Sequence, residues 1–175
     1  MRTADEDSFR AFATGQAPTL RRTAFLFCGD WHLAEDLMQA ALVKIYRSWS
    51  RVQKRESLTN YARTVLLRTW LDERRRPFRR SELSGAELPD VPEPAGDPAV
   101  RVWAKELVHR ALLELPPGQR AVLVLRYFDD LSVAETARVM RCAEGTVKSQ
   151  SARGLDALRA VVARLAPASG GLHRE

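Results

Sequence analysis

The residues best suited to chemistry lie between positions 131 and 160, and their chemistry is non-covalent binding to nucleic acid. Ser132 and Glu135 have the spacing of a capping box, which begins a helix. A second helix starts near position 144, and we expect Val147 on its buried side. Its other side offers cationic, hydroxyl and amide groups, which contact DNA when such a helix enters a major groove. The candidate contacts are Thr146, Lys148, Ser149, Gln150 and Arg153.

A second pattern of this kind runs through a predicted helix from about Leu58 to Arg76. At 100° per residue one side is apolar, and we assign it to the core. That side holds Leu58, Ala62, Val65, Leu66, Thr69 and Trp70. The other side mixes guanidinium, amide and hydroxyl groups, which bind phosphates and base edges, with exposed apolar surface. It holds Asn60, Arg63, Thr64, Leu67, Arg68, Leu71, Arg74 and Arg75.

Three large side chains near this helix are open to two interpretations. Trp49, Val52 and Tyr61 either stack on, or form a pocket for, unstacked bases, or they belong to the ordinary core. The sequence alone does not decide between the two.

The charge is distributed in blocks. The 175 residues carry a net charge of +6, but residues 41–80 alone carry twelve basic and three acidic side chains. Residues 81–100 carry five acidic side chains and no basic one, and residues 101–175 are again net positive. Positive blocks attract polyanions through phosphate contacts, so nucleic acid is the favoured partner.

The residue types that enzymes need are not arranged for catalysis. The chain has no phosphate-binding G-x-x-x-x-G-K-[ST] motif, no G-x-S-x-G and no H-E-x-x-H. The two cysteines, Cys28 and Cys142, are far apart and the three histidines are scattered. We therefore expect no catalytic residue, no metal, no cofactor and no small-molecule substrate. With no signal peptide and no apolar run of membrane-spanning length, the expected location is the cytoplasm.

Five of the nine prolines fall between Pro77 and Pro98, and four of these five lie in the acidic segment 81–100. Proline removes a hydrogen-bond donor and fixes φ, so we expect an extended, flexible linker there. The expected fold is all-α, with two small helical domains at 1–76 and 99–165, the linker at 77–98, and a disordered tail at 166–175. The 22 linker residues reach at most about 70 Å at ~3.3 Å each.

The remaining helices follow from capping and breaking residues. In the first domain we expect helices from Asp7 or Ser8 to Gln16, from Pro18 to Cys28, and from Trp31 to Trp49, with a polar connection over 50–57. In the second domain the expected helices are 99–114, 117–128, 133–140 and 144–165, and Asp129-Asp130 forms a turn.

The chain resembles the extracytoplasmic-function (ECF) sigma factors of bacterial RNA polymerase, a group of the sigma-70 family, and is similar to their sigma-E-like, actinobacterial type. The run LPPGQRAVLVLRYFDDLSVAETARVM, followed by EGTVKSQSARGLDALR, resembles region four, which reads the −35 promoter element. AEDLMQAALVKIYRSW and YARTVLLRTWLDERRR resemble region two, which docks on polymerase and opens the −10 element. The resemblance implies a transcription initiation factor whose partners are promoter DNA and core polymerase (its clamp helices and flap), with an anti-sigma factor as a further candidate.

The resemblance also implies roles for individual residues. Glu35, Asp36 and Gln39 would meet the clamp helices, and Arg126 would join the −35 contacts. Together with the basic helix face, the candidate −10 contacts are Lys44, Ser48, Val52, Asn60, Tyr61, Arg63, Thr64, Val65, Arg68 and Arg75.

Three positions depart from the family pattern. Arg68 stands where Asn is frequent, so the −10 preference is expected to differ. Arg141 replaces the usual turn glycine, which requires a non-glycine residue in a glycine conformation or a shifted turn. Ala143 replaces a Ser or Pro, so the second helix loses its best N-cap, at a cost of about 1 kcal/mol.

Other classes of protein are compatible with parts of the pattern. A stand-alone helix-turn-helix regulator that binds operator DNA as a dimer would explain the C-terminal half, but it leaves the docking pattern and the basic fourth helix unexplained. A helical module that binds only proteins would leave the +9 charge of residues 41–80 without a role.

Overall fold

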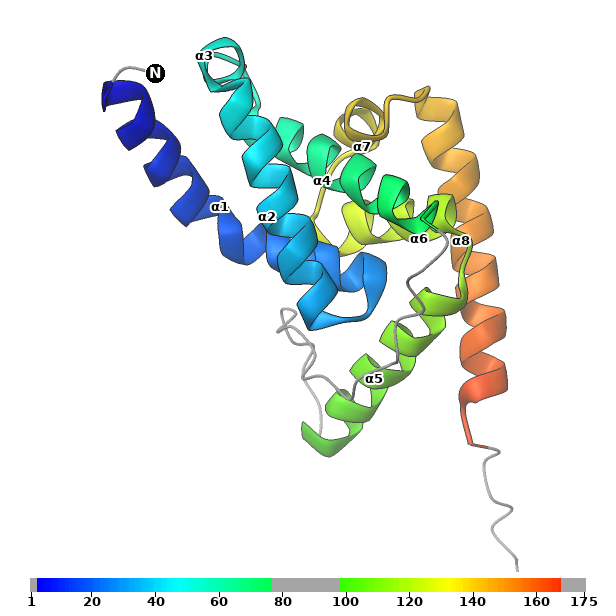
Figure 1. The fold of residues 1–175 in the computed structure, drawn as a ribbon. Coiled ribbons are helices and arrows are strands. Elements are labelled where there is room, and N and C mark those ends of the chain that lie inside the picture. The colour runs from blue at the N-terminus through cyan, green and yellow to red at the C-terminus, as the bar shows by residue number, and fades with distance from the viewer. Residues whose placement is uncertain (1–2, 77–97, 168–175) are drawn as a thin grey trace, which may run out of the picture.

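The computed structural model of the chain describes residues 3–76 and 98–167. Within these ranges there is no strand, and the all-α prediction is confirmed. One group of helices precedes position 77 and a second follows position 97 (Figure 1). The predicted linker, apart from Pro98, and most of the predicted tail lie outside the described residues, so the domain boundaries stay predictions.

The first group consists of α1 (Thr3–Cys28), α2 (Trp31–Arg47), the single turn α3 (Trp49–Val52) and α4 (Leu58–Arg74). Helices α1, α2 and α4 each pack on the other two. The short α3 overlaps the first three residues of the stretch 50–57 that the sequence assigns to a polar connection. That assignment is wrong at its start, because Trp49 and Val52 are both buried and draw the backbone into a helical turn.

The turn between α1 and α2 follows the sequence prediction. Gly29 has a φ of 76°, a conformation that glycine adopts without a steric penalty. The Asp30 carboxylate then accepts hydrogen bonds from the backbone N–H of His32 (2.7 Å) and of Leu33 (3.0 Å). The N–H groups in the first turn of a helix have no partner within the helix. Asp30 supplies that partner and is therefore the N-cap of α2.

The first helix is continuous, although the sequence predicts two helices separated before Pro18. An interior proline costs about 3 kcal/mol. Aromatic packing offsets this penalty, since Phe9 and Phe12 both contact the Trp49 ring, at centroid distances of 5.2 and 5.3 Å. Complete burial of an aromatic side chain contributes about 1.5–3 kcal/mol, and Phe9 and Phe12 are each half-buried against the core, so together they offset much of the proline penalty. Tertiary packing therefore overrides the local signal of Pro18.

The second group consists of α5 (Pro98–Glu114), α6 (Pro117–Leu123), α7 (Val133–Met140) and α8 (Glu144–Leu165). Between α6 and α7 lies η1 (Val124–Phe128), a short π-helix that the sequence does not predict. None of the helices in residues 3–76 and 98–167 combines the length and the apolar character needed to cross a membrane.

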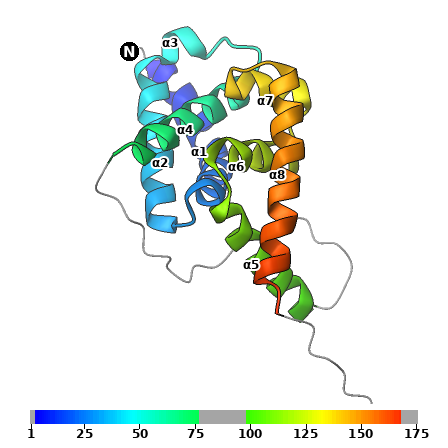
Figure 2. The ribbon, with the colours of Figure 1, turned by 90° about the vertical axis from the view of Figure 1, so that its right-hand side faces the viewer.

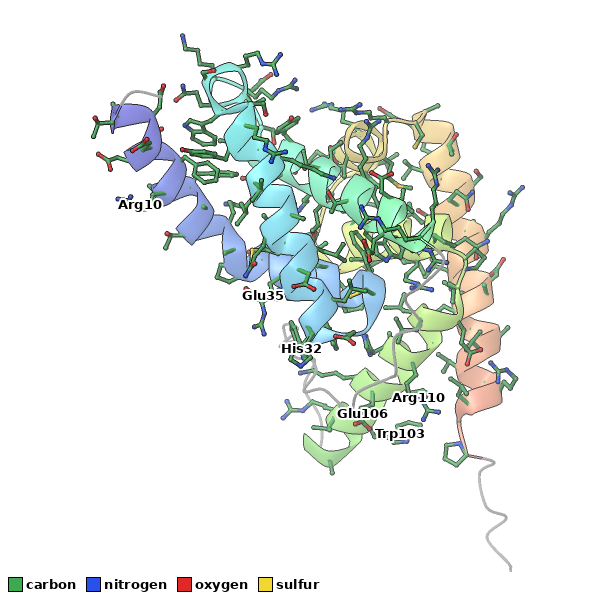
Figure 3. The ribbon with its side chains drawn as sticks, in the orientation of Figure 1. Arg10, His32, Glu35, Trp103, Glu106 and Arg110 are labelled. Atoms are coloured by element: carbon green, nitrogen blue, oxygen red, sulfur yellow. The ribbon has the colours of Figure 1, made fainter. Side chains whose placement is uncertain are left out.

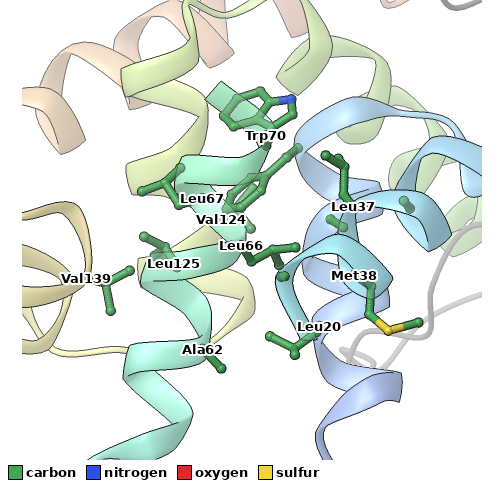
Figure 4. Close-up of a cluster of buried hydrophobic side chains, with 14 of the residues drawn as sticks. Leu20, Leu37, Met38, Ala62, Leu66, Leu67, Trp70, Val124, Leu125 and Val139 are labelled. Atoms are coloured by element: carbon green, nitrogen blue, oxygen red, sulfur yellow. The ribbon is translucent and has the colours of Figure 1, made fainter. Parts of the chain in front are cut away.

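The two groups share a hydrophobic core. Figure 4 shows α4 between the two sides of this core: Leu37 and Met38 lie on one side, and Leu125 and Val139 lie on the other. Val124 belongs to the same cluster. The second group also has a core of its own, where it packs α6 and α7 against α8. In this structure the two groups are therefore in direct contact rather than apart on a tether.

Arg120 joins the two groups through backbone carbonyls. This side chain is buried, and its guanidinium donates hydrogen bonds to Phe27 O (2.6 Å), Leu113 O (2.6 Å) and Leu115 O (2.9 Å). Burial lowers the pKa of Arg120 to about 10, so the group stays charged at neutral pH. The carbonyl groups at the C-terminal end of a helix carry a partial negative charge. The Arg120 guanidinium stabilises this charge at the ends of both α1 and α5.

Helix α8 lies along the outside of the molecule, as Figures 1 and 2 both show, with α2 on the opposite side. Gly154 permits the close approach of α8 to α6. A Cβ at this position would lie 3.1 Å from the Leu123 side chain. The face of α8 that turns away from α6 is left to solvent.

The connection between α7 and α8 contains a residue in a strained conformation. Arg141 has a φ of 53° and a ψ of 51°, in the left-handed region, and the N–H of Cys142 bonds back to Ala137 O at 3.0 Å. The helix therefore ends as if a glycine were present. The side chain at this position carries a steric penalty of about 1–2 kcal/mol.

We predict that Arg141→Gly raises the free energy of unfolding by about 1 kcal/mol and the melting temperature by about 2–4 °C, because it removes this penalty. Urea and thermal unfolding followed by circular dichroism measure the effect. Arg138→Gly is the matched control: Arg138 is exposed within α7, and the same exchange there destabilises the protein by a similar amount. If the two variants shift stability in the same direction, the strain at Arg141 is disproved.

Candidate nucleic-acid interfaces

Helices α7 and α8 form a helix-turn-helix whose geometry is set by its caps. Ser132 Oγ accepts from the N–H of Glu135 (3.1 Å), and the Glu135 carboxylate accepts from the N–H of Ser132 (2.8 Å). These hydrogen bonds lower the pKa of Glu135. The predicted capping box is confirmed. Ala143, at the N-cap of α8, provides no side-chain hydrogen bond, as expected for this one of the three predicted departures.

The faces predicted for α8 agree with the structure. Val147 and Gly154 are buried, whereas Lys148, Ser149 and Arg153 are exposed. Thr146 is exposed and Gln150 is half-buried at the edge of this face. Among the described residues neither Lys148 nor Arg153 has an ion-pair partner. Two cations that are unpaired within the described part of the chain, beside hydroxyl and amide groups, make a surface that is suited to phosphates and base edges.

Arg126 differs from the other predicted −35 residues. Its Nη1 donates to Leu131 O at 2.5 Å, and its guanidinium lies 5.7 Å from the centroid of the Tyr127 ring. In this structure the side chain holds the turn before α7. Its contact with the −35 duplex stays a prediction.

The second candidate surface, on α4, is partly covered. Arg68 and Arg75 are exposed, and Asn60, Tyr61 and Val65 are half-buried. Arg55 stacks over the Tyr61 ring at 4.5 Å, and Asn60 Oδ1 accepts from Arg63 Nη1 at 3.1 Å. A cleft of about 420 Å³ between α4 and α7 keeps Asn60 and Tyr61 accessible.

Two predicted −10 residues on α2 stay near the surface. Lys44 is exposed on the last turn of α2, and its ammonium donates to Thr69 Oγ1 of α4 at 2.9 Å. Ser48 is half-buried, and its hydroxyl donates to Ile45 O at 3.2 Å. Both side chains thus lie beside α4, on the edge of the same surface.

The face assignment of α4 is wrong at two positions, and the base-stacking interpretation does not describe Val52 in this structure. Thr64 and Leu67, expected on the exposed face, are 6% and 4% exposed, because the second group of helices packs on that face. Val52 is 4% exposed and belongs to the core, as does Trp49, whose indole N–H donates to Ser8 Oγ at 2.9 Å. The sequence could not show that α4 has neighbours on both sides.

Arg63 is also withdrawn from solvent. Its Nε donates to Asp129 Oδ2 at 3.0 Å, and its side chain is 11% exposed. Asp129 and Arg120 are the two polar residues that sequence reasoning missed. Arg120 could have been noticed as a lone charge before the apolar run AVLVL, but nothing in the spacing indicates that Asp129 is buried.

The three predicted docking residues lie together on α2. Asp36 and Gln39 are exposed, and Gln39 Nε2 donates to Glu35 Oε1 at 3.1 Å. Glu35, labelled in Figure 3, also pairs with Arg21 Nε at 2.8 Å. This face lies across the molecule from α8.

The cysteines lack the electrostatic environment of reactive thiols. Burial raises the pKa of Cys28 to about 11 and also raises the pKa of Cys142. Both thiols are therefore protonated at neutral pH, which disfavours nucleophilic chemistry.

Comparison with known proteins finds a family model that matches each half of the chain. The model of sigma-70 region 2 matches residues 12–80, and that of sigma-70 region 4 matches residues 105–158. The RNA polymerase sigma-E factor of Streptomyces coelicolor is 32% identical over 152 residues, covering 86% of this chain and 84% of that protein. The ECF RNA polymerase sigma factor SigM of Mycobacterium tuberculosis is 34% identical over 146 residues, covering 83% of this chain and 70% of that protein.

A solved structure has the same fold. The sigma factor RpoE of Bartonella quintana, crystallised with the anti-sigma factor NepR, superposes with a TM-score of 0.68 at 24% identity, over 91% of this chain and 99% of that one. The fold and the two sequence blocks define a sigma factor of RNA polymerase. The chain belongs to the sigma-70 family and, within it, to the ECF sigma factors.

We predict that Lys148→Ala and Arg153→Ala each weaken binding to duplex DNA about tenfold at low salt, because each removes an unpaired cation. Fluorescence anisotropy with a labelled 30-base-pair duplex, repeated over a range of salt concentrations, measures both affinity and salt dependence. Arg159→Ala is the control on the same helix, since Arg159 is exposed and already pairs with Asp156 at 3.2 Å. Equal affinity of all three variants and wild type would remove the DNA-binding role from this face.

Proposed function

We propose that this sigma factor binds core polymerase through Glu35, Asp36 and Gln39 of α2 and reads the −35 element through the exposed face of α8. The observation that supports it best is the position of these two surfaces, exposed and on opposite sides of one body. A protein that directs an enzyme to DNA needs two such separate surfaces.

The −10 contacts are assigned to α4 and the adjoining end of α2. The exposed members are Lys44, Arg68 and Arg75, and the members bordering the cleft are Asn60, Tyr61 and Thr64. Guanidinium and ammonium groups would bind the strand backbone, while amide, hydroxyl and phenol groups would contact unstacked bases. Val52, Ser48, Val65 and Arg63 complete the proposed set.

The protein itself is proposed to catalyse no reaction, because the polymerase supplies the chemistry. Promoters and polymerase share the cytoplasm in bacteria, which places the protein there. The Bartonella relative was crystallised with an anti-sigma factor, and we propose a partner of that type for this chain. A stand-alone regulator would leave the exposed docking residues of α2 without a role.

The test is run-off transcription with purified core polymerase and a genomic library, followed by mapping of start sites. Transcripts that depend on this chain and share two upstream elements support the proposal. No transcript, together with no retention of the chain on core polymerase, would refute it.

We predict that Asp36→Ala and Gln39→Ala weaken core binding about tenfold, because each removes a polar group from a contact that excludes water. Titration of labelled protein with core polymerase measures the dissociation constant. His32→Ala is the control, being exposed at the start of the same helix. Loss of duplex-DNA binding in the Asp36 or Gln39 variants would point instead to a general defect in folding.

A further inference from the structure

The single helical turn α3 is tied to the first turns of α1 by two side-chain hydrogen bonds. The indole N–H of Trp49 donates to Ser8 Oγ at 2.9 Å, and Gln53 Nε2 donates to Asp5 Oδ1 at 3.1 Å. The Ser8 hydroxyl in turn donates to Asp5 O at 3.1 Å, which leaves its lone pairs for the indole. Figures 1 and 2 both place α3 near the beginning of α1.

Aromatic contacts reinforce the same junction. Phe9 of α1 contacts both Tyr46 and Trp49, at ring-centroid distances of 4.9 and 5.2 Å, and both pairs meet edge to face. Phe12, on the next turn of α1, contacts the Trp49 ring at 5.3 Å. Edge-to-face pairs favour a definite orientation of the two rings in addition to burying apolar area. The beginning of α1 therefore determines both where Trp49 lies and how its ring is turned.

The four residues of α3 cannot form a stable helix by themselves. Helix formation is unfavourable until several turns exist, and α3 contains one. Its N-cap residue, Ser48, makes no side-chain capping hydrogen bond. The position of α3 therefore depends on tertiary contacts, and its contacts with α1 include the two directional hydrogen bonds of Ser8 and Asp5.

The junction adjoins the surface that we propose for the −10 element. Ser48 and Val52, two members of the proposed set, are the N-cap and the last residue of α3. Gln53, the partner of Asp5, begins the connection that leads from α3 to α4. A displacement of α3 would therefore move part of the proposed −10 surface.

The connection of residues 53–57 is also fixed at its other end. Ser57 Oγ accepts from the N–H of Asn60 at 3.4 Å, and the Arg55 guanidinium lies 4.5 Å from the centroid of the Tyr61 ring. The contact with Asp5 fixes the first end on α1. Held at both ends, this short segment sets the position of α3 relative to α4.

A simpler role for Asp5 would be to stabilise the N-terminal end of α1 by its negative charge. Glu6 lies in the same turn and can supply the same charge, but it is exposed, whereas Asp5 is half-buried with its carboxylate on Gln53. A helix dipole requires only the charge, whereas the contact with Gln53 requires a hydrogen-bond acceptor. Asparagine at position 5 separates these two roles, because it keeps the acceptor and removes the charge.

We propose that Asp5 and Ser8 are positioning residues for promoter opening. They hold α3 and the beginning of the 53–57 connection in the arrangement in which the −10 surface binds an unpaired strand. This inference rests on the proposed −10 role of α4 and the adjoining end of α2. Neither residue contacts DNA or polymerase in this proposal; both act through Trp49 and Gln53.

Five variants test the proposal. Asp5→Ala and Ser8→Ala each remove one hydrogen-bond acceptor from the junction. Asp5→Asn and Ser8→Thr are the conservative exchanges, which keep the acceptor. Glu6→Ala is the matched control, because it lies in the same turn and loses the same charge as Asp5→Ala.

Hydrogen exchange on the full chain measures how firmly α3 is held. The N–H groups of Val52 and Gln53 donate to Ser48 O at 3.1 Å and to Trp49 O at 2.9 Å. Their exchange rates report the opening of this turn. We expect about fivefold faster exchange at both amides in the two alanine variants of the junction, since each loses one hydrogen bond. The conservative exchanges and the Glu6 control should exchange like wild type.

Run-off transcription measures the consequence for function. Each variant is added in excess over core polymerase, on a promoter mapped with wild type. Asp5→Ala and Ser8→Ala should give about threefold fewer transcripts, because a loosely held α3 must be ordered at the expense of strand binding. Asp5→Asn, Ser8→Thr and Glu6→Ala should match wild type. Affinity for core polymerase and for the labelled 30-base-pair duplex should be unchanged in all five, since the faces of α2 and α8 are untouched.

The outcomes separate this inference from the proposed function. Equal exchange and equal transcription in all variants overturn the positioning role even when wild type directs transcription. Faster exchange without loss of transcripts overturns it too, because α1 would then support only the fold. A loss of transcripts that Asp5→Asn does not restore assigns the effect to charge and contradicts the role of the Gln53 contact. A wild type that never initiates with core polymerase refutes the proposed function itself, and the inference falls with it.

Discussion

The burial of one carboxylate, Asp129, is the constraint on which the arrangement of the whole molecule depends. An ionised carboxylate in an apolar interior is tolerated only with matched donors, and these come from α1 and α4 while the carboxylate comes from the segment after η1. Apolar contacts are not directional, so on their own they would tolerate small shifts of the second group of helices relative to the first. The hydrogen bonds of a buried charge are directional and tolerate few such shifts. Asp129 therefore fixes the register of the second group on the first.

The π-helix explains how the carboxylate reaches that position. Over Val124–Phe128 the backbone hydrogen bonds skip one residue more than in an α-helix, and the N–H of Asp129 reaches Val124 O at 3.0 Å. Such a bulge alters the direction of the residues that follow it. Arg126 then closes the turn on Leu131 O, and Asp130 adopts a φ of 53°. The hydrogen bond of Arg126 and the left-handed backbone of Asp130 thus orient the buried Asp129 side chain.

Local patterns predicted the helices well, and long-range contacts account for the errors. Capping at Asp30 and Ser132, and the two faces of α8, depend on residues close in sequence and were predicted correctly. The uninterrupted α1 depends on Trp49, which lies more than thirty residues beyond Pro18. Thr64 is buried by a half of the chain that the periodicity of α4 cannot reveal. The α8 contacts were predicted from the local helix-turn-helix pattern and the docking residues of α2 from resemblance, whereas Asp129 and Arg120 emerged only from the packing.

The accessible and covered surfaces follow the physical order of promoter opening. Duplex DNA and a protein surface exist before any base pair is broken, and the faces of α8 and α2 that suit them are exposed. A single strand exists only after melting, and the face of α4 that we propose for it is partly covered by the second group of helices. A cationic surface with affinity for single strands would otherwise bind any unpaired nucleic acid through phosphate contacts alone. The ion pair of Arg63 with Asp129 removes one cation from that surface, which lowers its non-specific attraction for unpaired strands and favours selectivity over total binding strength.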